Sequence, residues 1–178
     1  RNAISHGLNA FLQNPDQWAL LVSDPDRYIA GAVEEILRWA TPVMYFRRNA
    51  TADFELRGKT IKAGDKISLW YVSANRDEEV FDDPFRFDIT RDPNPHVAFG
   101  GGGPHFCLGA QLAKMEIRVL FEELVRRAPR IEALGPGVEP LHDIPCVVAG
   151  GQHQHGQAGA GGSQPPADFV AVEHGHPN

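Results

Sequence analysis

The residues with the clearest chemical potential surround Cys107. This cysteine lies in the run FGGGGPHFCLG at residues 99–109, where four consecutive glycines and a proline precede it. A cysteine that binds iron does so as a thiolate, which needs protection from water and backbone donors close to its sulfur. Glycines let the backbone pass close to a flat cofactor without steric hindrance from Cβ atoms, and Phe99 and Phe106 can exclude water. The run therefore offers the features that a thiolate ligand for iron needs.

Three other interpretations of this loop are possible. A Gly-rich turn with Cys107 as a small buried hydrophobe is the plainest, and the residues alone leave it open. A phosphate-binding loop is disfavoured, because no strand with GxGxxG spacing precedes the run and no Gly-Lys-Ser/Thr occurs in it. A zinc or redox centre is also disfavoured, because the only other cysteine, Cys146, stands alone and no pair of histidines lies at ligand spacing.

The elements expected to position Cys107 are mainly helical. Apolar residues recur at helical spacing in four segments, which predict helices over residues 1–12, 15–22 and 25–39 and from Cys107 to shortly before Pro129. Asn14-Pro15 and Asp24-Pro25 each offer an N-cap and a first-turn proline. The dipole of the last helix would favour a negative sulfur at its start by ~0.3 to 1 kcal/mol.

A small β region and a long meander separate the third and fourth predicted helices. Residues 43–69 contain short β-prone runs, with turns expected at 57–58 and 63–65. The following segment, residues 73–95, lacks clear periodicity and is predicted to be an ordered meander. Its three phenylalanines, Phe81, Phe85 and Phe87, are expected to be buried and to hold it.

Composition limits the class of protein and divides the chain. The formal net charge of −6 argues against nucleic acid as a partner. Apolar runs fall short of the ~20 residues that span a bilayer. Residues 1–145 are expected to form one unit, and the Gly-, His- and Gln-rich residues 146–178 to be disordered or aberrant. Because the chain starts with Arg1 and no signal segment, we expect the true N-terminus to be missing.

Two motifs give the chain a family resemblance. The run at residues 99–109 resembles the haem-binding loop of the cytochrome P450 family, and Glu35 and Arg38 match the family's Glu-x-x-Arg motif. Phe99 lies eight residues before Cys107, whereas the commonest family form has seven; a loop longer by one residue is familiar among actinobacterial members that oxidise sterols and branched lipids. The resemblance covers residues 1–145 and implies the C-terminal portion of the P450 fold, truncated at its N-terminal side.

The resemblance also implies a cofactor and its ligands. The cofactor is haem b, iron protoporphyrin IX, with Cys107 as the proximal ligand of the iron. Arg48 is expected at a propionate, with Arg47 as the competing assignment. The full set of implied cofactor-binding residues is Arg48, His96, Phe99, Gly100, His105, Cys107 and Gly109.

Further roles follow from the same resemblance. Glu35 and Arg38 are expected to form a buried network with an arginine of the meander, for which Arg76 is the first choice and Arg86 and Arg91 are alternatives. The apolar residues Val43 and Met44 are expected to face substrate. The acid and alcohol that activate oxygen in the family would lie upstream of Arg1, so no catalytic residue is assigned in this chain.

The implied function is a monooxygenase that inserts one oxygen atom from O2 into a C–H bond of a sterol or lipid. Electrons would come from a ferredoxin and a ferredoxin reductase, and the protein would be cytoplasmic and bacterial. A basic stretch, Lys114, Arg118, Arg126 and Arg127, is either a ferredoxin-docking surface or an ordinary solvated helix face. The alternative function is a non-catalytic, truncated remnant or pseudogene product.

Overall fold

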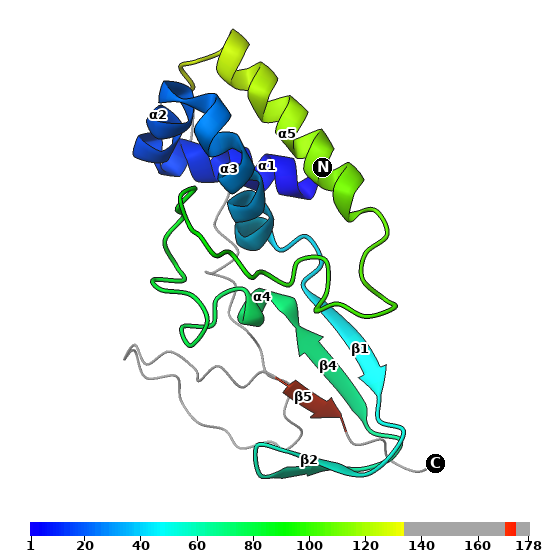
Figure 1. Cartoon of the computed structure of the whole chain (residues 1–178). Coiled ribbons are helices and arrows are strands. Elements are labelled where there is room, and N and C mark those ends of the chain that lie inside the picture. Colours follow the sequence, from blue (N-terminus) through cyan, green and yellow to red (C-terminus); the bar gives the residue numbers. More distant parts are fainter. Residues whose placement is uncertain (134–169, 174–178) are drawn as a thin grey trace.

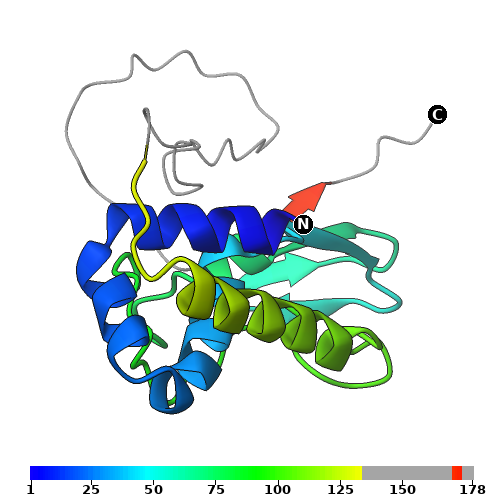
Figure 2. The ribbon, with the colours of Figure 1, turned by 90° about the horizontal axis from the view of Figure 1, so that it is seen from above.

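The computed structural model describes residues 1–133 and 170–173 and is mainly helical with a small β region (Figure 1). The helices are α1 (Asn2–Gln13), α2 (Pro15–Ser23), α3 (Pro25–Ala40), the single turn α4 (Tyr71–Ala74) and α5 (Ala110–Arg127). Seen from above, the long helices gather beside the strands (Figure 2). The four predicted long helices are confirmed, with ends that differ by a few residues. None of the described helices is both long enough and apolar enough to cross a membrane.

The β region consists of two small antiparallel sheets. One has the order β1 (Tyr45–Asn49), β4 (Lys66–Trp70) and β5 (Val170–Glu173), and the other pairs β2 (Phe54–Leu56) with β3 (Lys59–Ile61). The turn predicted at residues 57–58 connects β2 and β3, with φ of +47° at Arg57 and +75° at Gly58. Two successive positive φ values are typical of the tight turns that join antiparallel strands.

Helix α3 is the centre of the helical layer. It packs against α1, α2 and α5, and its residues Ile36 and Leu37 are buried together with Phe11, Leu21 and Phe121 of the other helices. Burial of apolar area at roughly 25 cal/mol per Å² is the main force that holds these helices together. The core therefore fixes α3 firmly against α5, the helix that follows Cys107.

Two helix starts were predicted to carry the same kind of cap, and they differ. Asp24 accepts a hydrogen bond from the backbone N of Arg27 at 3.2 Å and caps α3 as predicted. Asn14 makes no such bond to α2. Its amide donates to the Ala10 carbonyl at 2.8 Å, so it satisfies the C-terminus of α1, and Pro15 alone marks the start of α2.

The meander after α4 is held only in part as predicted. Phe81 and Phe87 are buried, but Phe85 is 43% exposed, and the prediction that it is buried is wrong. The inner side of the chain at this point is occupied by a polar group, because Arg38 binds the carbonyl oxygens of Pro84 and Arg86 on either side of Phe85.

The last two segments of interest are α5 and the C-terminal part. The buried residues of α5 are Ala110, Ile117, Phe121 and Val125. The apolar residues whose spacing predicted the helix are mostly exposed: Leu112, Met115 and Val119 lie on its exposed face, and Leu108 is exposed just before it begins. Within residues 146–178, expected to be disordered, the structure describes only β5, which pairs with β4; the rest of that prediction lies outside the described residues.

Candidate functional site

The loop before α5 depends on glycine. Its φ angles are +95° at Gly100, +98° at Gly102 and +77° at Gly103, a region that side chains with a Cβ rarely adopt. The backbone N of Cys107 donates to the Phe99 carbonyl at 3.1 Å, which closes the loop on itself. Glycine at positions 100, 102 and 103 is therefore required by the backbone path that brings Cys107 back beside Phe99.

Cys107 lies just outside the helix. Helix α5 begins at Ala110, three residues later than predicted, and the Ala110 N–H donates to the Cys107 carbonyl at 3.2 Å. The thiol is free and exposed, and Phe106 is 48% exposed. The shielding from water expected of Phe99 and Phe106 is thus not provided by these two residues alone.

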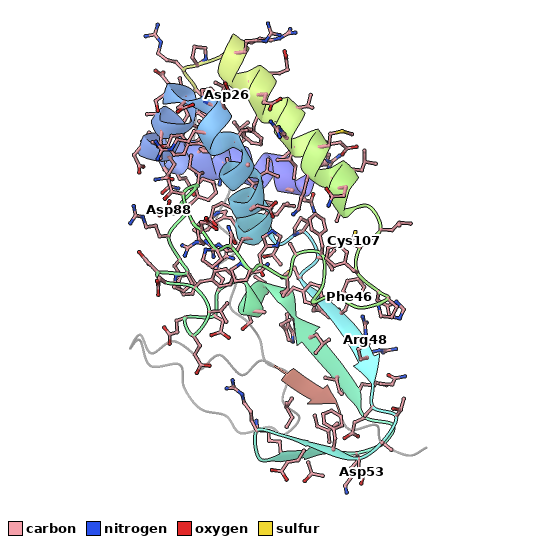
Figure 3. All side chains as sticks on the ribbon, in the orientation of Figure 1. Asp26, Phe46, Arg48, Asp53, Asp88 and Cys107 are labelled. Carbon is pink, nitrogen blue, oxygen red and sulfur yellow. The ribbon has the colours of Figure 1, made fainter. Side chains whose placement is uncertain are left out.

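A pocket of about 620 Å³ opens beside the thiol. Figure 3 shows Cys107 near the base of α5 and Phe46 and Arg48 on the neighbouring strand β1. Of the predicted site residues, Val43, Arg48, Phe99, His105 and Cys107 line this pocket. Its other walls come from α1, α3, β1, α5 and Tyr71, and they include Ile4, Leu37, Phe46, Ala113 and Ile117. The volume lies within the roughly 300–1,000 Å³ that is usual for ligand pockets.

The strand β1 separates the two candidate arginines. Successive side chains of a strand point to opposite faces, and Phe46 and Arg48 line the pocket, whereas Arg47 does not. The Arg48 guanidinium lies 5.5 Å from the Phe46 ring centroid, and Phe46 in turn lies 5.7 Å from the Tyr71 ring. Arg48 is therefore the arginine of this pair that can reach a ligand in the pocket.

Several predicted residues lie away from the pocket lining. Gly100 and Gly109 shape the cysteine loop; a Cβ on Gly109 would come within 4.0 Å of the Cys107 sulfur. Met44 is half-buried, and its carbonyl accepts from the Val72 N–H at 3.3 Å. The buried His96 places its Nε2 2.9 Å from a Glu34 carboxylate oxygen. In this structure His96 is thus engaged by α3.

The Glu35–Arg38 pair is buried. Two hydrogen bonds of 2.8 and 2.7 Å join their side chains, and neither side chain is exposed. Arg38 also donates to the carbonyl oxygens of Asn75, Pro84 and Arg86. A buried pair with all its bonds made holds its surroundings in one arrangement, so α3 and the meander are locked together here.

The three arginines of the meander that the sequence offered as partners for Glu35 and Arg38 make different contacts. Arg91 makes the direct contact, with its Nε 3.5 Å from a Glu35 carboxylate oxygen. Arg76 instead donates to the carbonyl oxygens of Arg38 and Trp39 and stacks 4.7 Å from the Trp39 ring centroid. Burial, followed by the nearby charge of Arg38, lowers the pKa of Arg76 to about 10. Arg86 contributes its carbonyl only.

Sequence reasoning missed Asn75, which connects this network to the cysteine loop. Its side-chain oxygen accepts from the Val97 N–H at 2.8 Å, and its amide donates to the Thr41 hydroxyl at 2.9 Å. Thr41 ends α3 with a φ of +35°. Apart from the position of Asn75 beside Arg76, the sequence gives no signal for this role, because both partners of Asn75 are distant in sequence.

The basic stretch on α5 is matched by carboxylates. Lys114 lies 2.7 Å from Glu34, and Arg118 lies 2.7 Å from Glu122. Arg126 and Arg127 both contact Glu123. These pairs reduce the local positive charge, which weakens the basis for electrostatic attraction of an acidic partner.

The pocket suits a flat, largely apolar group that carries anionic substituents. Its walls are mainly aliphatic and aromatic, a thiol stands at one side, and a guanidinium and an imidazole, from Arg48 and His105, lie in the same lining. Guanidinium and imidazole N–H groups can both donate hydrogen bonds to carboxylates. The residues present therefore fit a haem with Cys107 toward the iron.

Comparison with known proteins agrees with this chemistry. Residues 27–128 match the model of the cytochrome P450 family. The methyl-branched lipid omega-hydroxylase of Mycobacterium tuberculosis is 59% identical over 133 residues, which are 75% of this chain and 31% of that protein. The steroid C26-monooxygenase of Mycolicibacterium smegmatis is 50% identical over 135 residues, which are 76% of this chain and 31% of that protein.

A solved structure shares the fold. A cytochrome P450 of Mycobacterium marinum in complex with pseudoionone superposes with a TM-score of 0.72 at 55% identity, over 74% of this chain and 32% of that one. The chain belongs to the cytochrome P450 family. It spans about a third of the length of the relatives it matches.

Proposed function

We propose that this chain forms the haem-thiolate site of a monooxygenase that inserts one oxygen atom from O2 into a C–H bond of a lipid or sterol. The observation that carries the proposal is the convergence of Cys107, Arg48 and His105 on one mainly apolar pocket. When bound, the haem supplies oxygen activation, which a thiolate ligand favours. The protein residues hold, orient and shield that group.

Each residue has a role in this proposal. The Cys107 sulfur would hold the iron, and Arg48 and His105 would bind the propionates. The glycines of the loop keep space for the flat ring, and Phe46 and Phe99 exclude water from its edge. Val43, which lines the pocket, and Met44 border the space for substrate.

The substrate class is proposed from the relatives. The two curated proteins are named for activity on a methyl-branched lipid and on a steroid. The apolar character of Val43, Leu37 and Ile4 in the pocket wall supports an apolar substrate of this kind. A ligand with a long aliphatic part gains about 0.8 kcal/mol for each buried CH₂ group.

Electrons are proposed to come from a ferredoxin and its reductase, in a bacterial cytoplasm. The four cations of α5 are the proposed contact, although each lies beside a carboxylate. If they dock the ferredoxin, reversing the charge of Arg118 slows electron transfer, and the effect grows at low salt. Rates that do not change with ionic strength would remove this surface from the proposal.

We further propose that the chain corresponds to the C-terminal, haem-binding portion of the P450 fold, which agrees with its coverage of about a third of each relative. The oxygen-activating acid and alcohol are then supplied by sequence outside this chain. A second candidate, a non-catalytic remnant, is favoured by one observation: Leu108, Leu112, Met115 and Val119 form an exposed apolar stripe, which is typical of a surface that needs a covering.

The proposal is tested by adding haem to residues 1–178 and recording the spectrum of the reduced carbon monoxide complex. We expect the thiolate-type band in the wild-type chain, its loss in Cys107→Ser and its retention in Cys146→Ser. Retention of the band in Cys107→Ser contradicts the ligand assignment. Absence of both haem binding and a cooperative unfolding transition favours the remnant.

Turnover separates the site from the complete enzyme. The haem-loaded chain is mixed with a ferredoxin, its reductase, and a sterol or a methyl-branched fatty acid. We expect it to keep its haem and not to hydroxylate the substrate. The reason is that the acid and alcohol needed for proton delivery to oxygen are proposed to lie outside this chain. Substrate-dependent hydroxylation by the chain contradicts the proposed division of the enzyme.

A further inference from the structure

A second acidic residue of α3 reaches the cysteine loop. Glu34 has two partners: its carboxylate lies 2.9 Å from Nε2 of His96 and 2.7 Å from Nζ of Lys114. His96 belongs to the segment before the glycines and Lys114 to the second turn of α5. A single carboxylate therefore connects three parts of the chain that meet around Cys107.

The hydrogen bonds of His96 define its tautomer. Its Nδ1 accepts from the Ala98 N–H at 3.3 Å, so that nitrogen carries no proton. The ring proton is on Nε2, which donates to Glu34. Both ring nitrogens are thus used, and the buried imidazole, with its side chain 5% exposed, is fixed between its own loop and α3.

The two partners of Glu34 also enclose Phe99. The Lys114 ammonium lies 5.8 Å from the Phe99 ring centroid, within the range of a cation–π contact. The His96 ring lies 6.2 Å from the same ring. The Phe99 carbonyl then accepts the backbone N–H of Cys107 at 3.1 Å. A continuous series of contacts runs from Glu34 to the backbone of the cysteine.

This series is separate from the Glu35–Arg38 network. Adjacent residues on a helix differ in direction by about 100°. Glu35 accordingly binds Arg38, the Asp88 N–H and Asn94 of the meander, whereas Glu34 binds His96, just before the cysteine loop, and Lys114 of α5. The two carboxylates hold different segments.

We propose that Glu34 is a positioning residue for Cys107, acting with His96 and Lys114 as a clamp on Phe99. The proposal rests on the proposed haem-thiolate function for its purpose, but the clamp itself belongs to the protein alone. By holding Phe99 from α3 and α5 at once, Glu34 fixes the carbonyl that binds the Cys107 amide. The sulfur is thereby presented to the pocket in one direction.

The test measures the loop directly. In residues 1–178 without haem, hydrogen exchange of the Cys107 amide and the rate of thiol labelling at Cys107 are compared for Glu34→Gln, Lys114→Met and the double variant. We expect each single variant to accelerate both by roughly threefold to tenfold, since one partly exposed charged hydrogen bond is lost. The double variant is expected to add little beyond either single one, because both remove the same clamp.

Glu122→Gln is the matched control, because Glu122 pairs with Arg118 on the exposed face of α5, the helix that carries Lys114. A change confined to the loop amides supports the clamp. An equal acceleration of the Phe121 amide in the core shows general destabilisation and overturns it, as does a Cys107 rate no different from that of the control.

The haem-loaded proteins give an independent measurement. In Glu34→Gln and Lys114→Met, we expect a smaller thiolate-type fraction of the reduced carbon monoxide spectrum than in the control. If the wild-type chain shows no thiolate band at all, the proposed function fails, while the exchange data still decide whether Glu34 holds the loop.

Discussion

Glu35 and Arg38, one turn apart on α3, face each other through two hydrogen bonds in a place that solvent does not reach. Removing the carboxylate leaves a buried guanidinium without its counter-charge, which costs about 3–5 kcal/mol. We therefore expect Glu35→Gln to lower the free energy of unfolding by about that amount, measured by urea denaturation with tryptophan fluorescence. Glu122→Gln, which breaks an exposed pair with Arg118, is expected to cost under ~1 kcal/mol. Equal losses in the two variants would show that burial of the first pair has no energetic consequence.

Arg48 and Arg47 provide a matched comparison for cofactor binding. Arg48 lines the pocket and Arg47 does not. Since a hydrogen bond to a charged group contributes about 1.5–3 kcal/mol, Arg48→Gln is expected to weaken haem binding roughly tenfold to a hundredfold. Arg47→Gln is expected to change it little. Titration of haem into each variant, followed by absorbance, measures the difference, and a larger loss in Arg47→Gln would reverse the assignment.

Gly31 allows α3 to approach the meander. A Cβ at this position would lie 2.3 Å from the Ile89 carbonyl oxygen, and a backbone atom cannot move aside as a side chain can. In a helix interior alanine is more favourable than glycine by ~1 kcal/mol. At this position we expect the overpacking to outweigh that gain, since overpacking typically costs at least ~1–3 kcal/mol, so Gly31→Ala should destabilise the chain. Gly101→Ala is the control, because no atom lies near its added Cβ. Thermal unfolding of both variants checks this, and a gain in stability for Gly31→Ala contradicts the close approach.

The charge of Glu34 predicts a dependence of stability on pH. The hydrogen bond from His96, assisted by that from Lys114, lowers the pKa of Glu34 below its ordinary value of 4.5. A carboxyl whose folded pKa is lowered contributes stability above its unfolded pKa and loses it as the pH falls through the folded pKa. The difference in unfolding free energy between wild type and Glu34→Gln should thus be greatest above about pH 5 and shrink as the pH falls below the ordinary pKa of 4.5. A difference that stays constant over this range would contradict the role of the charge.

Local signals in the sequence predicted local structure well. The Asp24 cap of α3 and the Arg57-Gly58 turn depend on neighbours only, and both are found as expected. The pairing of Glu35 with Arg38 could also be predicted from the sequence, because one helical turn joins the two residues. The resemblance of the glycine loop to a family motif, and not its spacing alone, pointed to Cys107.

Features that depend on distant partners were harder to predict. Arg91 reaches Glu35 and Arg76 does not, because the path of the meander decides which arginine returns to α3. Phe85 is exposed for a similar reason: carbonyl groups of its neighbours occupy the inner side. Tyr71 and Asn75 carried no recognisable motif of their own, and only their positions in the fold give them a place at the site.

Because β1 pairs with β4 in one register, the number of residues in β1 matters more than the residue type at most of its positions. Arg48 pairs with Ile67 and Arg47 with Ser68, and the two arginines differ in chemistry only through the face of the strand that each occupies. A deletion or insertion of a single residue in β1 exchanges the faces of every side chain beyond it. It would turn Arg48 and Phe46 out of the pocket while leaving composition, charge and strand propensity almost unchanged. In an alignment of natural or engineered variants, this strand should accordingly accept substitutions at positions such as Arg47 that do not line the pocket, yet show no gaps.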